Sequence, residues 1–321
     1  MSSDERANAY DATCVHCGAP VPAGAGLLRH GHRGWDVYDR EHAPAPGPPP
    51  PGDHPGWHRR RLLSLDIGST GNDPARDRIT AVAVRGSDGA AWEWVLDLGS
   101  NILDPEVGSE IRAPNIGSSI PDPKGGSDIP DPNIGSNVQD PDLGSAPQDP
   151  DTGSRIQDAS PASPTPPAQA LEELATLLTD HLAHHELLVV WYAPHVLATL
   201  HAELLRHGLA PLADRLPDGV VAPVCDPLVL DRHADRYRPG GRSLPVVAEW
   251  YGVPLERPGD PASDAGAALR VAGAIAASYP AVARLSRPML HAEQMIWYAE
   301  QMERHPDAPA WPFDPVEPVT D

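Results

Sequence analysis

Seven consecutive nine-residue units between residues 97 and 159 constrain the fold of this chain more than any other feature. The units follow the consensus x-Φ-G-S-x-I-x-D-P, and nearly every unit ends with a proline. Each unit offers few apolar side chains, and proline interrupts both helices and sheet ladders. The array carries 12 acidic and 3 basic residues, so it also repels itself. We therefore predict an extended, mobile insertion within a folded domain.

A short β-solenoid with nine-residue turns is the alternative for this array, because fixed self-similarity is typical of repeat folds. The Gly and Asp content resembles that of calcium-binding β-rolls. The alternating G-x-G-x-D pattern that builds carboxylate-lined turns is missing, however. The array is also a candidate for function in its own right, as an acidic spacer or partner-binding segment.

The overall charge limits the classes of function. A net charge of −21 disfavours generic binding to nucleic acid, so any such contact must be local. Candidate patches are the run Arg59, Arg60 and Arg61 and the Arg-rich stretch 232–242. Three cysteines cannot build a secreted disulfide framework, and the sequence shows no signal peptide and no long apolar span. We expect a cytoplasmic protein without membrane contact.

The remaining sequence divides into segments of different composition. Residues 1–42 carry a Cys-x-x-Cys motif and several histidines, and residues 43–56 form a Pro-rich linker that we expect to be extended. Residues 57–97 and 168–303 are predicted to form one domain that the repeat array interrupts. Residues 304–321 form a tail that contains Trp and Pro.

Both parts of the interrupted domain show the periodicities of strands and helices. The first part predicts three strands, which end at residue 66, span 78–86 and end at residue 97. A GSDG turn joins the last two strands as a hairpin. The second part predicts strands at 186–193 and 219–226 and helices at 170–185, 194–208, 227–236, 244–251, 264–278 and 289–304. Together they predict an α/β fold with a mixed sheet flanked by helices.

The N-terminal segment contains a candidate zinc site. Cys14-x-x-Cys17 resembles half of a zinc knuckle, and a treble-clef-type module would place a second ligand pair after an aromatic-containing strand. His42 and Asp39 would form that second pair, with His30 or His32 as alternatives. The competing interpretation is a disordered N-terminus with reduced thiols.

Three further stretches keep the order and spacing of a known set of motifs. They are LDIGSTGNDPARDRITAVAV, LLVVWYAPHVLATLHAELLRHGL and the long block from VCDPLVLDRHADRYRPGG through ASDAGAALRVA. Together they resemble the DEDD-type (DnaQ-like) 3′–5′ exonuclease family, as in the epsilon proofreading subunit of bacterial DNA polymerase III. The resemblance covers about residues 57–97 and 168–303. It implies a ribonuclease H-like fold and two Mg²⁺ or Mn²⁺ ions that activate water against a phosphodiester.

In that family four carboxylates hold the metal ions and a histidine acts as general base. Carried over by position, the resemblance keeps Asp66 and Asp264. Gly68 stands at the glutamate position, Val196 at the second aspartate position and Gly259 at the histidine position. Neither Val nor Gly can ligate a metal, and two carboxylates neutralise two divalent cations poorly.

The sequence therefore predicts an exonuclease-like protein that is inactive or impaired. It would act as a binding or scaffold module for a nucleic-acid end or a protein partner. The rival hypothesis is a working exonuclease in which other residues replace the lost ones. The neighbouring candidates are His195, beside Val196, and Asp260, beside Gly259.

Overall fold

Two small antiparallel strand pairs form the N-terminal module. The computed structural model describes residues 6–31, 34–44, 47–98, 165–236, 238 and 240–319. In the module, β1 (Ala12–Thr13) pairs with β2 (Pro20–Val21), and β3 (Leu27–Gly31) pairs with β4 (Gly34–Tyr38). Apart from its first two residues, the repeat array lies outside the described residues, so the prediction for it stays a prediction.

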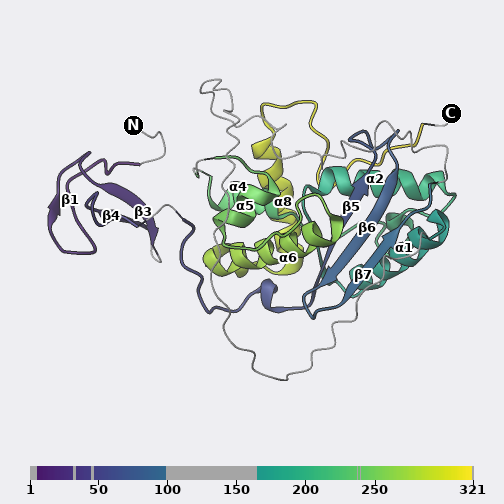
Figure 1. Cartoon of the computed structure of the whole chain (residues 1–321), viewed down its shortest axis with the longest axis horizontal. Helices are drawn as coiled ribbons and strands as arrows, with labels where there is room; N and C mark the ends of the chain where they lie inside the picture. The colour runs from purple at the N-terminus through teal and green to yellow at the C-terminus, as the bar shows by residue number, and fades with distance from the viewer. Residues whose placement is uncertain are drawn as a thin grey trace, which may run out of the picture.

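A five-stranded mixed sheet forms the centre of the larger domain (Figure 1). Its strands are β5 (Leu62–Ser69), β6 (Ile79–Gly86), β7 (Ala91–Val95), β8 (Leu187–Val190) and β9 (Val224–Cys225). Their order is β7-β6-β5-β8-β9. The pairs β7–β6 and β6–β5 are antiparallel, whereas β5–β8 and β8–β9 are parallel. The predicted mixed sheet is thus confirmed.

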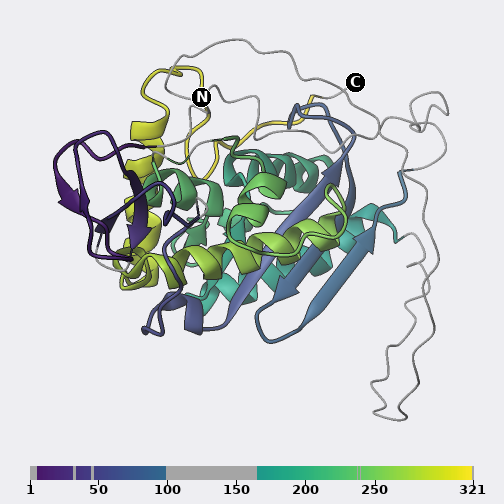
Figure 2. The ribbon, with the colours of Figure 1, turned by 60° about the vertical axis from the view of Figure 1, so that its left-hand side comes forward.

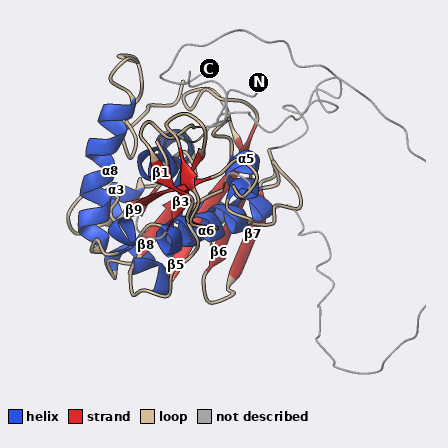
Figure 3. Ribbon diagram, turned by 90° about the vertical axis from the view of Figure 1, so that its left-hand side faces the viewer, coloured by secondary structure: helices blue, strands red, loops and turns tan. Residues whose placement is uncertain are grey.

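Helices cover both faces of this sheet, as Figures 1 and 3 show. They are α1 (Pro167–Ala183), α2 (Ala193–Arg206), α3 (Leu212–Arg215), α4 (Pro227–Ala234), α5 (Leu244–Trp250), α6 (Pro261–Ser278), α7 (Pro280–Ala283) and α8 (Arg287–Gln301). A proline stands in the first two positions of every one of these helices except α3. Proline fits there because the first N–H groups of a helix have no partner within it.

Two strands, β5 and β9, differ most from the extents predicted from the sequence. β5 continues three residues beyond Asp66, so this residue lies inside a strand rather than at its end. β9 has only two residues, whereas we predicted a strand over 219–226. Pro223 explains the difference, because proline has no N–H to give to a sheet ladder; only its carbonyl is used, by Leu188.

The central strand β5 presents a different chemistry to each face of the sheet. Leu63 and Leu65 are fully buried on one face. Ser64, Asp66 and Gly68 alternate with them and point to the other face, which α6 covers. A Cβ at Gly68 would lie 3.4 Å from Cγ of Pro261, which shows how closely α6 approaches.

Two residues that flank the repeat array, Leu96 before it and Thr165 after it, meet on the sheet. Thr165 lies opposite Leu96 in an isolated parallel bridge. The backbone N–H of Thr165 donates to the carbonyl of Val95 at 2.8 Å, and the N–H of Asp97 donates to the carbonyl of Thr165 at 3.1 Å. The chain therefore leaves the domain and returns to it at one point beside β7.

The linker and the tail both contact the larger domain (Figure 2). In the linker, the N–H of Gly52 donates to the carbonyl of Ala277 at 2.8 Å, and Nε2 of His54 lies 2.9 Å from the carbonyl of Ala276. In the tail, Trp311 is buried. None of the described helices has the length and apolar character that crossing a membrane requires.

Candidate functional site

Asp66 and Asp264 lie near each other at the N-terminal end of α6. Asp66 comes from β5 and Asp264 from the first turn of α6. Burial raises the pKa of Asp66 well above its ordinary value, and the charges of Asp264 and Asp260 raise it further. The two retained positions of the resemblance are therefore neighbours in space, and both carboxyls resist ionisation in the absence of a cation.

A backbone N–H already binds one oxygen of the second carboxyl, that of Asp264. Burial raises the pKa of Asp264 to about 6, although a hydrogen bond from the N–H of Gly259 opposes the rise. That N–H donates to Oδ2 of Asp264 at 2.9 Å. The other oxygen, Oδ1, is shielded from solvent and has no hydrogen-bond partner. One oxygen of this carboxylate is thus used to fix the loop before α6.

The three positions that the resemblance assigns to missing family residues are part of the packing or the backbone turns of the fold. A Cβ at Gly68 would lie 3.1 Å from Oγ1 of Thr80, so a glutamate there would need its neighbours to move. Val196 is 4% exposed and belongs to the hydrophobic core. Gly259 has φ of +88°, a backbone conformation that other residues rarely adopt. Placing the family's side chains at these positions would therefore disturb packing or backbone geometry at each of them.

Both neighbouring candidates already have contacts of their own, and neither belongs to a cluster of metal-ligand atoms among the described residues. Asp260 is the N-cap of α6: its Oδ2 accepts the N–H of Ser263 at 2.9 Å and lies 3.3 Å from Nη2 of Arg257. His195 is buried in α2, with its ring stacked on Tyr192 at a centroid distance of 6.2 Å. Burial lowers the pKa of His195, which favours the neutral ring.

The described carboxylates do not form a metal cluster at this point. Within the part of the chain that the structure describes, only one group of three Cys, His, Asp or Glu ligand atoms lies within 4.8 Å of one another, and it is elsewhere. The family resemblance implies Mg²⁺ or Mn²⁺ here. The residues present do not fit two such ions, because two carboxyls remain and one oxygen already accepts the Gly259 N–H.

Asp77 and Arg78, from the first of the three stretches that resemble the family, have hydrogen-bond and ion-pair partners within the fold. Asp77 accepts hydrogen bonds from Oγ1 of Thr70 at 3.1 Å and from the N–H of Asp73 at 2.7 Å. Nη2 of Arg78 lies 2.9 Å from Oε1 of Glu203, a fully buried residue of α2. These contacts close the β5–β6 loop and fasten it to α2, so folding alone accounts for these residues.

Asp226 is a buried acid for which the sequence analysis predicted no role. Its carboxylate accepts the N–H groups of Tyr192 at 3.1 Å, Ala193 at 2.9 Å and Leu228 at 3.0 Å. Burial raises its pKa to about 6, although these hydrogen bonds oppose the rise. One side chain thus caps both α2 and α4. The Asp-Pro pair at the start of the helix predicted over 227–236 is the sequence signal from which this cap could have been predicted.

The predicted zinc ligands of the N-terminal module come together in part. Ligand atoms of Cys14, Cys17 and His42 form the group within 4.8 Å, and Sγ of Cys14 lies 3.8 Å from Nδ1 of His42. Asp39 is not a member of the group, and its Oδ1 accepts the N–H of Glu41 at 3.0 Å. The alternatives His30 and His32 have side chains outside the described residues.

The surroundings of Cys14 favour a metal ligand. Burial disfavours its thiolate, but hydrogen bonds from the backbone of Asp39, Cys17 and His16 and from the side chain of His42 outweigh burial and lower the pKa of Cys14 to about 6. Gly18 follows the motif with φ of +74°, which closes the turn. Because thiolates are the form that binds zinc, this turn can hold the metal together with Cys17 and His42.

The candidate arginine patch before β5 is largely neutralised by acids. Nη2 of Arg59 lies 2.9 Å from Oδ1 of Asp53. Arg61 lies 3.3 Å from both Asp88 and Glu186. Since paired guanidinium groups attract phosphate less than free ones, Arg59 and Arg61 offer a weak contact surface.

Comparisons with known proteins find structural neighbours only. No protein-family model matches the chain, and no curated protein matches it significantly. One structure of exonuclease I has 15% sequence identity and a TM-score of 0.45, over 70% of this chain and 42% of exonuclease I. For E. coli exonuclease I in complex with a dA16 oligonucleotide the values are 14% and 0.44, over 70% and 42% of the two chains.

A second organism gives a similar result. Exonuclease I from Methylocaldum szegediense has 14% identity and a TM-score of 0.42, over 68% of this chain and 41% of that protein. The chain thus spans about two-fifths of the length of the exonucleases to which it is similar.

Proposed function

We propose that this chain is a degenerate relative of the DEDD-type 3′–5′ exonucleases that binds a nucleic-acid end or a protein partner without hydrolysing phosphodiesters. One observation carries the proposal: at the position of the family's general base stands Gly259, whose N–H occupies a carboxylate oxygen of Asp264. The group that should take a proton is absent, and a remaining ligand is committed to the fold.

Electrostatics supports the same conclusion. Two divalent cations about 4 Å apart repel each other strongly unless several carboxylates neutralise them. Here Asp66 and Asp264 lie close enough for their charges to interact, and among the described residues no third carboxylate completes a ligand cluster with them.

A nuclease assay tests this proposal. The full chain is incubated with single-stranded DNA and with RNA in Mg²⁺ and separately in Mn²⁺, and released nucleotides are measured. We expect no release above that of the Asp66→Ala variant. Release that disappears in Asp66→Ala would show a working exonuclease and contradict the proposal.

We also propose that Cys14, Cys17 and His42 hold one Zn²⁺ that fastens the N-terminal module. Zinc is four-coordinate in structural sites, and Asp39 would supply the fourth ligand after its carboxylate turns from the N–H of Glu41. The ion would replace buried apolar contacts that so small a module lacks.

Metal analysis of the purified chain tests the zinc site. We expect one zinc per chain, and less than half of that in Cys17→Ser and His42→Ala. His16→Ala is the matched control, because this ring lies tilted beside that of His42, with the centroids 4.7 Å apart, without belonging to the ligand group. A wild-type chain without zinc would refute the site, and full zinc in Asp39→Ala would refute the fourth ligand.

A further inference from the structure

The two cysteines of the N-terminal module share one turn but differ in exposure. Cys14 is buried, with 1% of its surface exposed, whereas Cys17 is exposed. The N–H of Gly18 donates to the carbonyl of Cys14 at 2.8 Å, and the N–H of Cys14 donates to the carbonyl of Ala19 at the same distance. These hydrogen bonds close the turn. A reagent in solution therefore reaches the sulfur of Cys17 before that of Cys14.

The two sulfur atoms lie close enough to bond to each other after a small movement. The ligand atoms of Cys14, Cys17 and His42 all lie within 4.8 Å of one another. A disulfide needs a sulfur–sulfur distance of about 2 Å. Rotation of the two side chains can close the remaining gap, and Cys-x-x-Cys is a spacing at which redox proteins form disulfides. The same two thiols can therefore bind a metal ion or each other.

The third cysteine of the chain does not compete in such a reaction. Cys225 lies in β9 of the larger domain and is fully buried. Burial raises the pKa of its thiol well above the ordinary value, so this thiol stays protonated and unreactive. The chain thus offers one pair of thiols that can react with each other.

The module has a small apolar core, so its stability depends on cross-links. Among its described residues, the buried apolar side chains are those of Cys14, Val21 and Leu27. With zinc bound, the two cysteines are joined to His42, which follows Cys14 by 28 residues. A disulfide between Cys14 and Cys17 closes only their own turn, and a cross-link restrains the chain less when its loop is shorter. Exchange of the metal for a disulfide would therefore loosen the segment that carries His42.

We propose that Cys14 and Cys17 form a reversible redox switch, in which a peroxide closes a disulfide between them and expels the zinc ion. The inference rests on the proposed zinc site, and it gives the ligands of that site a second state. In this state His42 has lost its link to the turn, and the end of the module is released.

The reaction proceeds in two balanced steps. Zinc holds both thiols deprotonated, and the Cys17 thiolate attacks one oxygen of hydrogen peroxide. The O–O bond breaks, a sulfenic acid forms, and the hydroxide that leaves takes up a proton to give water. The Cys14 thiolate then attacks the sulfenic sulfur, the S–O bond breaks, and a second hydroxide becomes water. Two electrons have passed from the thiolates to the peroxide, and the neutral disulfide no longer holds the cation.

Intact-mass spectrometry together with a zinc-binding dye tests the switch in the full, zinc-loaded chain. A small molar excess of hydrogen peroxide should remove the mass of two hydrogen atoms and release one zinc ion per chain. Dithiothreitol with added zinc should reverse both changes, because thiol–disulfide exchange regenerates the ligands. Cys225→Ala is the matched control and should behave as the wild type, since this thiol is fully buried in the larger domain. Cys17→Ser should lose no hydrogen.

Limited digestion with trypsin measures the effect of the switch on the module. The N–H of His42 donates to the carbonyl of Asp39 at 3.0 Å, and Arg40 lies within this turn. Cleavage after Arg40 should be about tenfold faster in the oxidised chain, because proteolysis follows the population of the open segment. Cleavage after Arg284, an exposed residue between α7 and α8, should not change.

Every outcome supports or overturns the switch. Zinc that stays bound in peroxide overturns it, and so do cysteines that gain oxygen, as located by peptide mapping, in place of a disulfide. Equal cleavage after Arg40 before and after oxidation also overturns it, because the disulfide would then release nothing. A wild-type chain purified without zinc refutes the zinc site, whereas the mass measurement on that chain still decides whether the thiol pair closes.

Discussion

Replacing Asp264 by asparagine should stabilise the protein at neutral pH. Burial raises the pKa of this carboxyl from 3.8 to about 6, so the folded state resists its ionisation. A carboxyl whose pKa is raised on folding contributes full stability below its unfolded pKa and loses it as the pH rises through its folded pKa. The wild-type chain should therefore lose stability between about pH 4 and pH 6.

The magnitude follows from the same values. A rise from 3.8 to about 6 corresponds to about 3 kcal/mol. Because Asp264 keeps partial access to solvent, screening reduces the expected gain of Asp264→Asn at pH 7 to about 1–2 kcal/mol. Asparagine keeps an oxygen that can accept the Gly259 N–H, so the loop should remain in place.

Urea unfolding at a series of pH values measures this effect. Wild type and Asp264→Asn should have equal free energies of unfolding near pH 4 and differ above pH 6. Asp307→Asn, at an exposed position, is the control for the substitution itself. Added Mg²⁺ should leave the difference unchanged. If Mg²⁺ instead stabilised wild type and not Asp264→Asn, the acids would hold a metal ion and the reasoning would be refuted.

Three further variants test other parts of the structure. Asp226→Ala should lower the free energy of unfolding by about 2–4 kcal/mol in urea titrations, because three N–H groups lose their acceptor. Asp226→Asn should lower it clearly less, and equal losses would contradict the role of Asp226 as a cap of both helices. Glu203→Gln should cost about 3 kcal/mol in the same titrations, because Arg78 and Arg206 lose a buried countercharge, and a cost under 1 kcal/mol would count against it. Gly68→Glu should lower stability by about 1–3 kcal/mol, since its Cβ meets Thr80 and Pro261, and should restore no nucleotide release; restored release would show that this position alone blocks activity.

Periodicity and turn signals predicted the sheet and its helices because these elements are determined locally. The apolar run at 187–190 and the helix with Pro194 in its first turn are examples, since burial and the missing N–H both act within a few residues. The proximity of Asp66 and Asp264 depended on the motif resemblance, because strand order brings β5 to α6 over a long separation in sequence.

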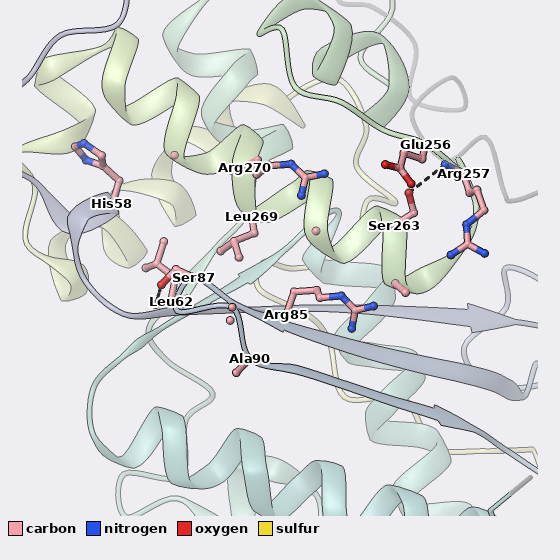
Figure 4. Close-up of a pocket in the computed structure, with 15 residues that line it drawn as sticks. His58, Leu62, Arg85, Ser87, Ala90, Glu256, Arg257, Ser263, Leu269 and Arg270 are labelled. Atoms are coloured by element: carbon pink, nitrogen blue, oxygen red, sulfur yellow. Dashed lines mark hydrogen bonds between the residues drawn. The ribbon is translucent and has the colours of Figure 1, made fainter. Parts of the chain in front are cut away.

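Other features had no local signal. Arg85 and Arg270 line the same pocket (Figure 4), although they are far apart in sequence and belong to no motif. The ion pair between Arg78 and Glu203 was not predicted either, because no pattern in either segment indicates which residue the other will contact. For Asp39 the pattern indicated a ligand, yet a nearby N–H competes for its carboxylate. Such contacts depend on the tertiary arrangement, which periodicity does not describe.

The bridge between Leu96 and Thr165 has a consequence for how this protein can vary among its relatives. Because Leu96 and Thr165 are bridged to each other, the positions at which the array joins the sheet do not depend on its length. Copies of the nonapeptide can therefore be gained or lost without a change in the sheet. For an array that is extended and mobile, as the sequence predicts, doubling its length would cost only about 0.6 kcal/mol in closure entropy. Copy number is thus a parameter that evolution, or an engineer, can adjust almost independently of folding.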